Sequence, residues 1–186
     1  VPTPLNGNPA IKRVSTFLEK STDHGVVDEV DVRGMHNGNL LALHMTWRSD
    51  KHDKIVDLDE FVDGVAVMFP LTPNASAVLM GSSTDPVNAW YWKGNLTEQG
   101  FDVIAQGYGT SARSKSAHQP IHAHASHAEG LWRVVMARSL SVDDTRVSFV
   151  AGSETRLAFA VWNGGNRERA GRKSFSGDFT KADIEA

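Results

Sequence analysis

Along most of the chain, apolar and polar residues alternate over short stretches that end in turn-forming residues. The stretch NLLALHMTWRSD places apolar side chains at every second position (Leu41, Leu43, Met45 and Trp47), whereas DGVAVMFPL is a nearly continuous apolar run. Alternation with a period of two is typical of a strand with one buried face, and a short continuous run is typical of a central strand. The pattern predicts a mainly β protein, an antiparallel β-sandwich with a few short helices and long loops, formed by residues 1–186 as a single domain.

Further strands are expected in VVDEVDVRGMHNG, NAWYWKG, FDVIAQGYG, GLWRVVMARSL, RVSFVAG and RLAFAVWNGG. Helical periodicity is scarce, and only PAIKRVSTFLEKST and LDEFVD are expected to contain short helices. Two polar segments break the alternation, the histidine-rich GTSARSKSAHQPIHAHASHAEG and the charged GGNRERAGRKSFSGDFTKADIEA. Both are expected to be loops, because long polar segments between strands are usually functional or mobile connections.

Composition narrows the classes of function. A formal net charge of −3 gives no sign of a nucleic-acid partner or of an anionic membrane surface as a partner. No apolar run approaches the roughly 20 residues that a membrane span requires. VPTPLNGNPAIKRV lacks a signal-peptide pattern, so we expect a cytoplasmic protein or a mature, already processed one. The chain has no cysteine, which excludes disulfides, thiolate metal sites, iron–sulfur clusters and covalently attached c-type haem.

Four histidines lie within ten residues: His118, His122, His124 and His127. Imidazole is a ligand for zinc, copper and nickel, but this spacing on a loop has no fixed geometry and no carboxylate-rich motif accompanies it. A solvated loop or a subunit contact is therefore favoured over a metal site. The sequence also lacks a Gly-x-Ser-x-Gly elbow and a Walker motif, so neither a hydrolase nor a nucleotide-binding protein is indicated.

The segment VLMGSSTDPVNAWYWKG concentrates a methionine, three large aromatic residues and a lysine in a short span. In a strand, Trp90 and Trp92 point to one face and Tyr91 points to the other. Two indoles on one face can fill a core, or they can line a groove for a flat ligand such as a sugar ring or a porphyrin. The spacing alone favours core packing and leaves both interpretations open.

Three blocks, read in order, resemble a known family. They are NLLALHMTWRSDKHDK…DEFVDGVAVMFP, VLMGSSTDPVNAWYWKG, and GLWRVVMARSL…RLAFAVWNGGNRERAGRKSFS. Together they resemble the haem-binding gamma subunits of ethylbenzene dehydrogenase, dimethylsulfide dehydrogenase, chlorate reductase and selenate reductase, over about residues 28–177. The resemblance implies a β-sandwich that binds one haem b without a covalent bond, in the periplasm, beside an iron–sulfur beta subunit and a molybdenum alpha subunit.

The role implied by this resemblance is that of a non-catalytic electron-transfer subunit of a chlorate reductase or dehydrogenase type of complex. Such a subunit relays electrons between the iron–sulfur subunit and an external carrier such as a cytochrome c. Neither a nucleic-acid partner nor a membrane span is expected. Two other classes stay open, a carbohydrate-binding β-sandwich module and a histidine-rich periplasmic metal-binding protein that uses the His118–His127 segment.

The resemblance also implies that a methionine and a lysine ligate the haem iron. The methionine matches Met80 of LMG, and the lysine best matches Lys173 of GRKSFS, with Lys93 of WYWKG as the alternative. Trp90 and Trp92 are expected to form walls of the haem slot. Since the two axial ligands approach from opposite faces, the distant Lys173 is favoured over Lys93. The candidates for pairing with the haem propionates are Arg113, Arg133, Arg138, Arg167, Arg169 and Arg172.

Overall fold

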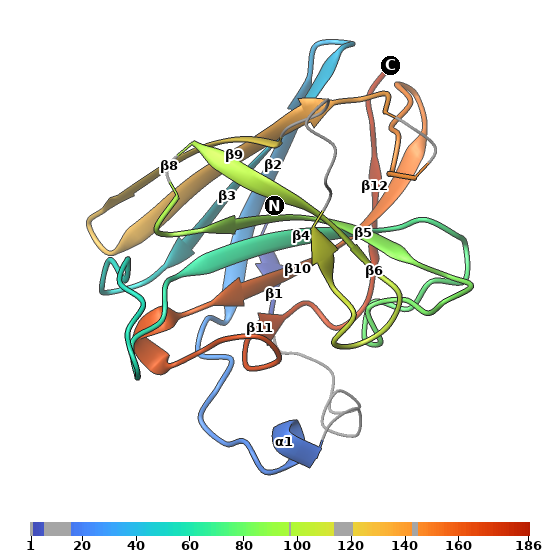
Figure 1. Ribbon diagram of the computed structural model, residues 1–186. Coiled ribbons are helices and arrows are strands. Elements are labelled where there is room, and N and C mark those ends of the chain that lie inside the picture. The colour runs from blue at the N-terminus through green and yellow to red at the C-terminus, as the bar shows by residue number, and fades with distance from the viewer. Residues whose placement is uncertain (1, 6–15, 97, 114–120, 143–144) are drawn as a thin grey trace.

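The computed structural model of the protein describes residues 2–5, 16–96, 98–113, 121–142 and 145–186, and almost all of the regular structure in them is antiparallel β-strand (Figure 1). The mainly β class that the alternation predicts is confirmed. The strands are β1 (Pro2–Pro4), β2 (Glu29–His36), β3 (Leu40–Arg48), β4 (Gly64–Pro70), β5 (Val87–Lys93), β6 (Gln99–Ala105), β7 (Ala112–Arg113), β8 (Ile121–Ala128), β9 (Leu131–Ser139), β10 (Glu154–Trp162), β11 (Ser174–Phe175) and β12 (Thr180–Asp183). The described helices are α1 (Thr16–Glu19) and the 3-10 turn η2 (Gly164–Asn166).

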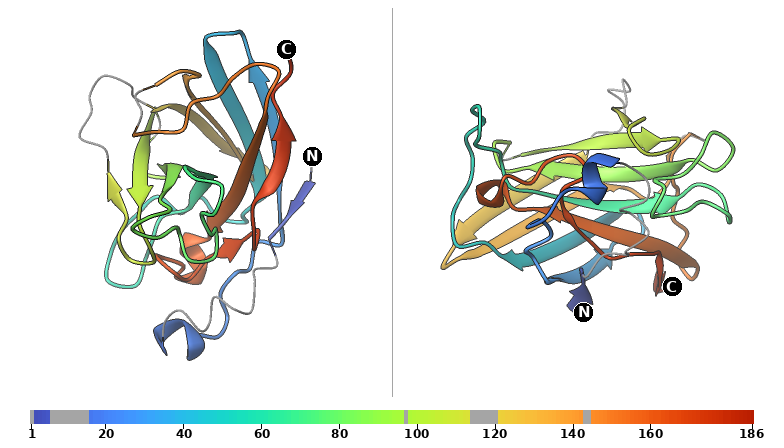
Figure 2. Two further views of the ribbon diagram at one scale, coloured as in Figure 1. Left: turned by 90° about the vertical axis from the view of Figure 1, so that its right-hand side faces the viewer. Right: turned by 90° about the horizontal axis from the view of Figure 1, so that it is seen from below.

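The two layers of the expected sandwich are the halves of one continuous, curled sheet. Its strand order is β1-β2-β3-β9-β8-β6-β5-β4-β10-β11, with β12 paired to β10 and β7 paired to β6. The β2-β3-β9-β8 half lies across from the β6-β5-β4-β10 half, as the views along different axes show (Figure 2). One hydrophobic core cluster contains side chains from both halves, so the core fills the space inside the curl.

Three tryptophans connect the two halves of the sheet. Trp47 on β3 stacks on Trp132 of β9, with ring centroids 6.1 Å apart, and Trp92 on β5 meets Trp132 edge-on at 4.9 Å. All three are buried, and their mutual packing adds to the free energy that burial of their area supplies. The apolar face expected for β3 is confirmed, because its alternate side chains are all in this core: Leu41, Leu43, Met45 and Trp47.

Two segments expected to be strand or helix are irregular, and the reason is the same in both. RVSFVAG is not a strand, and its Phe149 instead inserts from a loop into the core, 5.0 Å from the ring of Phe69. LDEFVD contains no helix; its Asp63 is fully buried and accepts hydrogen bonds from Trp132 Nε1 at 2.7 Å and from the Gly164 amide at 2.8 Å. In both segments, tertiary contacts decide the conformation. The short helix expected in PAIKRVSTFLEKST is present as α1.

The two segments expected to be loops contain strands. The histidine-rich segment includes β7 and β8, and the charged C-terminal segment includes η2, β11 and β12. In β8 the side chains of Ile121, Ala123 and Ala125 point inward, and they alternate with the exposed His122 and His124. Alanine differs little from polar residues in hydrophobicity, so the alternation of buried and exposed positions in β8 could not be recognised from the sequence.

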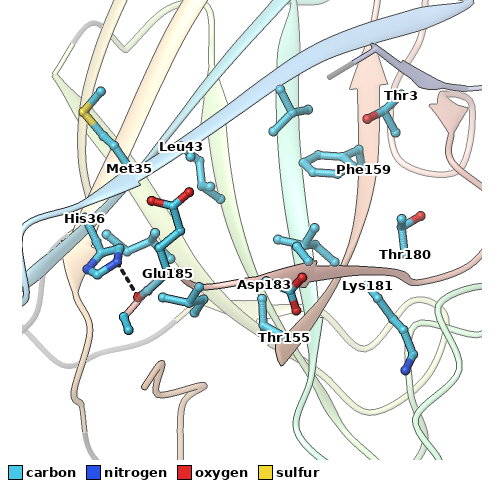
Figure 3. Close-up of a pocket in the computed structure, with 17 residues that line it drawn as sticks. Thr3, Met35, His36, Leu43, Thr155, Phe159, Thr180, Lys181, Asp183 and Glu185 are labelled. Atoms are coloured by element: carbon cyan, nitrogen blue, oxygen red, sulfur yellow. Dashed lines mark hydrogen bonds between the residues drawn. The ribbon is translucent and has the colours of Figure 1, made fainter. Parts of the chain in front are cut away.

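The curl of the sheet is open between β2 and β12. Within the described strands, β2 pairs with β1 and β3, and β12 pairs with β10. A cavity of about 540 Å³ lies along this opening, with Leu43 and Phe159 among its lining residues, and the His36 Nε2 atom lies 3.0 Å from the Glu185 carbonyl oxygen at one end (Figure 3). No described helix is long and apolar enough to cross a membrane.

Candidate functional site

The side chains of Met80 and Lys173 meet at the outer face of the β6-β5-β4-β10 half of the sheet. Lys173 Nζ lies 4.0 Å from Met80 Sδ, although the residues are 93 positions apart in the sequence. Both side chains line a cavity of about 400 Å³ and a smaller adjoining one of about 40 Å³. The structure therefore brings together the two residues that the sequence singled out as a ligand pair.

The floor of these cavities is made of small side chains on neighbouring strands. Residues directly opposite each other in an antiparallel pair share a face of the sheet. Strand register thus places Tyr91, Ala66 and Ala160 in one row across β5, β4 and β10, and Ala89, Met68 and Ala158 in the next row. Alanines at the centre of the face leave a shallow depression, which aromatic and long side chains surround.

The structure does not bring Trp90 and Trp92 to this site. They point to the opposite face of β5, where both are fully buried in the core with neighbours such as Val67. The aromatic lining of the larger cavity comes instead from Tyr91, Tyr108 and Trp162. The ring centroids of Tyr91 and Trp162 are 5.1 Å apart. The predicted alternation of the three aromatic residues of β5 is confirmed, but alternation does not show which face of the strand is the core.

The backbone at Met80 has an uncommon conformation that its surroundings impose. Met80 has φ of 57°, in the left-handed region, and Gly81 follows with φ of 79°. The Met80 amide donates to Ala77 O at 3.1 Å, and its carbonyl accepts from the Gly107 amide at 3.0 Å. A β-carbon at position 81 would come within 2.7 Å of Asp85 O, so this turn requires glycine. A left-handed conformation is unfavourable for a residue other than glycine, and it persists here because these main-chain hydrogen bonds hold the turn that carries the Met80 side chain.

Lys173 is positioned by the buried polar groups on either side of it. Upstream, the Glu168 carboxylate accepts hydrogen bonds from the Gly25 amide at 2.7 Å and the Asn163 amide at 3.0 Å. Downstream, Ser174 Oγ accepts from the Val27 amide at 3.0 Å. The segment between β10 and β11 is therefore tied to the chain that precedes β2, and this fixes the direction of the lysine.

The amine of Lys173 lies in an aromatic environment. Its Nζ atom is 5.1 Å from the ring centroid of Trp162 and 5.8 Å from that of Phe175, and no carboxylate of a described residue forms a salt bridge with it. Burial lowers the pKa of Lys173 to about 8. The neutral amine, which has a lone pair for a metal ion, is therefore far more accessible near pH 7 than in an ordinary lysine.

Lys93, the alternative partner, lies elsewhere. It ends β5, its Nζ atom is 5.8 Å from the ring centroid of Tyr91, and it lines neither of the two cavities.

Of the six candidate arginines, only Arg113 lines the larger cavity. The others do not: Arg133, Arg138, Arg167, Arg169 and Arg172. Arg138 is buried and forms a salt bridge with Asp102 at 3.1 Å, and Arg167 pairs with Asp59 at the surface at 3.6 Å.

The described histidines of the His118–His127 segment do not line the cavities at the Met80–Lys173 pair. His118 is outside the described residues, and His122 and His124 are exposed on the outer face of β8. His127 Nε2 lies 2.8 Å from Ser49 O, and its ring stacks on His52 at 4.9 Å. Within the described part of the chain, no three side chains of the histidine, cysteine, aspartate or glutamate type are arranged to bind a metal ion.

Comparison with known proteins finds a family model that matches most of the chain. The family model described as ethylbenzene dehydrogenase matches residues 3–119 and 104–174, which is more than half of the chain. The chain belongs to the ethylbenzene dehydrogenase family. Both Met80 and Lys173 lie within the matched ranges. The resemblance found in the three sequence blocks is thereby confirmed.

Relatives of this ethylbenzene dehydrogenase family chain include subunits of three oxidoreductases. A Haloferax mediterranei protein, provisionally named as a respiratory nitrate reductase heme subunit, is 33% identical over 153 residues, covering 81% of this chain and 54% of the relative. The chlorate reductase subunit gamma of Ideonella dechloratans is 28% identical, covering 72% and 56%. The dimethylsulfide dehydrogenase subunit gamma of Rhodovulum sulfidophilum is 29% identical, covering 72% and 52%. The chain spans about half the length of each of these relatives.

Proposed function

We propose that this protein is an electron-transfer subunit that binds one b-type haem through Met80 and Lys173. The observation that carries the proposal is the 4.0 Å separation of Met80 Sδ and Lys173 Nζ at an apolar, aromatic cavity. Thioether sulfur is a known iron ligand in haem proteins, and a neutral amine has a lone pair for a metal ion, so Met80 and Lys173 would be able to hold the iron of a haem together.

The environment of Lys173 suits a ligand role. A lysine must lose its proton before it can bind a metal ion. With an ordinary pKa near 10.5, deprotonation at pH 7 requires about 5 kcal/mol, whereas a pKa of about 8 reduces this to about 1 kcal/mol. Burial of the amine thus removes most of the free-energy cost of deprotonation that iron binding would otherwise have to offset.

Met80 and the lack of cysteine in residues 1–186 support the proposed kind of haem site. With no thiol among these residues for covalent attachment, a haem at this site would be held by ligation and packing. A thioether ligand favours ferrous iron and raises the reduction potential. When bound, haem supplies a one-electron carrier. Because Met80 and Lys173 would take both axial positions, no position is left for a substrate, and the site is suited to electron transfer rather than catalysis.

The names of the relatives suggest which partner subunits this chain has. The relatives are named as subunits of a nitrate reductase, a chlorate reductase and a dimethylsulfide dehydrogenase, one of them a heme subunit. We therefore propose that the chain serves a periplasmic molybdenum oxidoreductase, relaying electrons between its iron–sulfur beta subunit and an external carrier such as a cytochrome c. Purification of the complex from its native source, with identification of its subunits by mass spectrometry, tests this part.

The tryptophans that suggested a carbohydrate-binding module are not arranged on the surface as such a module requires. Of the five tryptophans, four are buried in the core, namely Trp47, Trp90, Trp92 and Trp132. Trp162 is partly buried and lines the Met80–Lys173 cavity. The described surface thus has no row of indoles that could stack on sugar rings.

The direct test is titration of the haem-free protein with haemin, followed by absorption spectroscopy. We expect a six-coordinate, low-spin complex with one haem per chain, whose colour is removed by acid acetone. A protein that forms no Soret-band complex, or whose pigment stays with the polypeptide in acid acetone, contradicts the proposal.

A further inference from the structure

The larger cavity at the Met80–Lys173 pair is positively charged. Among its described lining residues two are cationic, Lys173 and Arg113, and none is an aspartate or a glutamate. A cavity with low-dielectric walls and charges of one sign attracts a ligand that carries the opposite charge. The cavity is therefore suited to a ligand with an anionic group as well as a flat apolar body.

Arg113 is directed to this cavity by strand pairing. It lies opposite Val103 in the β6–β7 pair, and Val103 lies opposite Ala89 in the β5–β6 pair, so the three residues share one face of the sheet. The guanidinium carbon is 4.0 Å from the ring centroid of Phe101, which packs beside Tyr91. Stacking on Phe101 holds the guanidinium at the edge of the cavity floor.

The charge of Arg113 is not neutralised within the described part of the chain. None of the salt bridges there includes it. Burial raises the pKa of Tyr91 to about 12, and the positive charge of Arg113 opposes that rise. The electrostatic field of Arg113 therefore acts on a side chain that lines the cavity. Arg113 is also exposed, so its remaining N–H groups are accessible to a ligand.

We propose that Arg113, together with the hydroxyl of Ser111, forms a carboxylate-binding end of the cavity. The acidic edge of the cofactor then lies toward the β6–β7 hairpin, while Lys173 and Met80 bind its metal. The inference rests on the proposed haem function and adds the direction in which the cofactor lies.

The two cations of the cavity have different roles in this arrangement. Lys173 must be neutral to serve as a ligand, so it cannot also neutralise a carboxylate. Arginine stays protonated at any physiological pH, and its planar guanidinium can donate two parallel hydrogen bonds to one carboxylate. Arg113 is therefore the cavity side chain suited to a permanent ion pair with a haem propionate.

The test compares haem with haem dimethyl ester, in which both propionates are uncharged. The two ligands are titrated into the wild-type protein, Arg113→Gln and Arg169→Gln. Arg169 is a matched control, because it is also an exposed arginine above an aromatic ring, 4.6 Å from the Phe61 centroid, and does not line the cavity. We expect Arg113→Gln to weaken binding of haem about tenfold, the effect of losing a charge-assisted hydrogen bond, and to leave binding of the ester unchanged.

The remaining outcomes are equally informative. Arg169→Gln should bind both ligands as the wild type does. If Arg113→Gln binds haem as tightly as the wild type, or loses affinity for haem and ester by the same factor, the assignment of Arg113 is overturned while the haem function stands. If the wild type binds neither ligand, the proposed function fails and the inference fails with it. Far-UV circular dichroism of each variant checks that the sheet is intact.

Discussion

Met80 Sδ and Lys173 Nζ lie 4.0 Å apart, and each is fixed by a different part of the fold. Met80 belongs to the β4–β5 connection, which is tied to the β6–β7 hairpin through the Gly107 amide. Lys173 belongs to the segment between β10 and β11, which Glu168 ties to the chain before β2. Because the two supports are separate, removal of one side chain should leave the other in place.

The first prediction uses this independence. We expect Lys173→Ala to convert the haem complex from low-spin to a high-spin or water-ligated form, because Met80 alone cannot fill both axial positions. Lys93→Ala is the matched control, since Lys93 is also a partly buried lysine near the ring of Tyr91 but lines neither cavity. Absorption and electron paramagnetic resonance spectra measure the spin state. A normal spectrum for Lys173→Ala and a disturbed one for Lys93→Ala would reverse the assignment.

The second prediction concerns pH. Lys173 has a pKa of about 8, so below pH 8 the amine is mostly cationic and must release a proton on binding iron. The affinity for haem should therefore rise about tenfold per pH unit from pH 6 to 8 and become flat above pH 8. Titrations across this range measure the slope, with Lys173→Ala as the control that should lack it. An equal slope in that variant would assign the released proton to another group.

The third prediction tests the alanine floor. Ala89 lines both cavities at the Met80–Lys173 pair, and a leucine there would occupy the space of a flat ligand. Because overpacking typically costs about 1–3 kcal/mol, Ala89→Leu should weaken haem binding roughly 5- to 150-fold. Ala137→Leu is the control, since Ala137 is also a partly buried alanine within a strand but lies on β9, away from the cavity. Equal haem affinity of Ala89→Leu and the wild type would show that the ligand lies elsewhere.

Much of the fold could be predicted from local alternation, because an antiparallel strand with one buried face has a period of two. The failures have a physical pattern. In β8 the inward residues include Ala123 and Ala125, whose small side chains hardly differ from polar neighbours in hydrophobic signal. In RVSFVAG the apolar signal was real, but Phe149 enters the core from an irregular segment.

The candidate site was only partly predictable, for a related reason. Alternation shows that Trp90 and Tyr91 point to opposite faces, but either face of a central strand can be covered. The core lies on the side of Trp90, and the cavity lies on the side of Tyr91. Nor does any local pattern mark Trp162 or Arg113 as cavity residues, because only the pairing of β10, β4, β5, β6 and β7 brings them to one face.

The fourth prediction distinguishes the two kinds of tryptophan. Trp92→Leu should lower the free energy of unfolding by about 2–4 kcal/mol, because it removes a fully buried indole from the contact with Trp132, and should leave the haem spectrum unchanged. Trp162→Leu should have a smaller effect on stability and should alter the spectrum, since Lys173 Nζ lies 5.1 Å from that ring. Urea unfolding and absorption spectra measure the two effects. If the spectrum changes in Trp92→Leu but not in Trp162→Leu, the cofactor lies on the other face of β5.

The last prediction is the replacement of Met80 by histidine. The backbone should accept the change, because histidine is one of the residues found more often than most in the left-handed conformation, and Met80 has φ of 57°. Imidazole can replace the thioether as a ligand, so we expect Met80→His to keep a six-coordinate, low-spin haem. Thioether ligation raises the reduction potential relative to imidazole, and the potential of Met80→His should therefore fall below that of the wild type. A spectroelectrochemical titration measures the shift. Met80→Ala serves as the control that loses the ligand without replacing it, and it should be high-spin or water-ligated. If Met80→His has an unchanged or higher potential, Met80 is not an axial ligand.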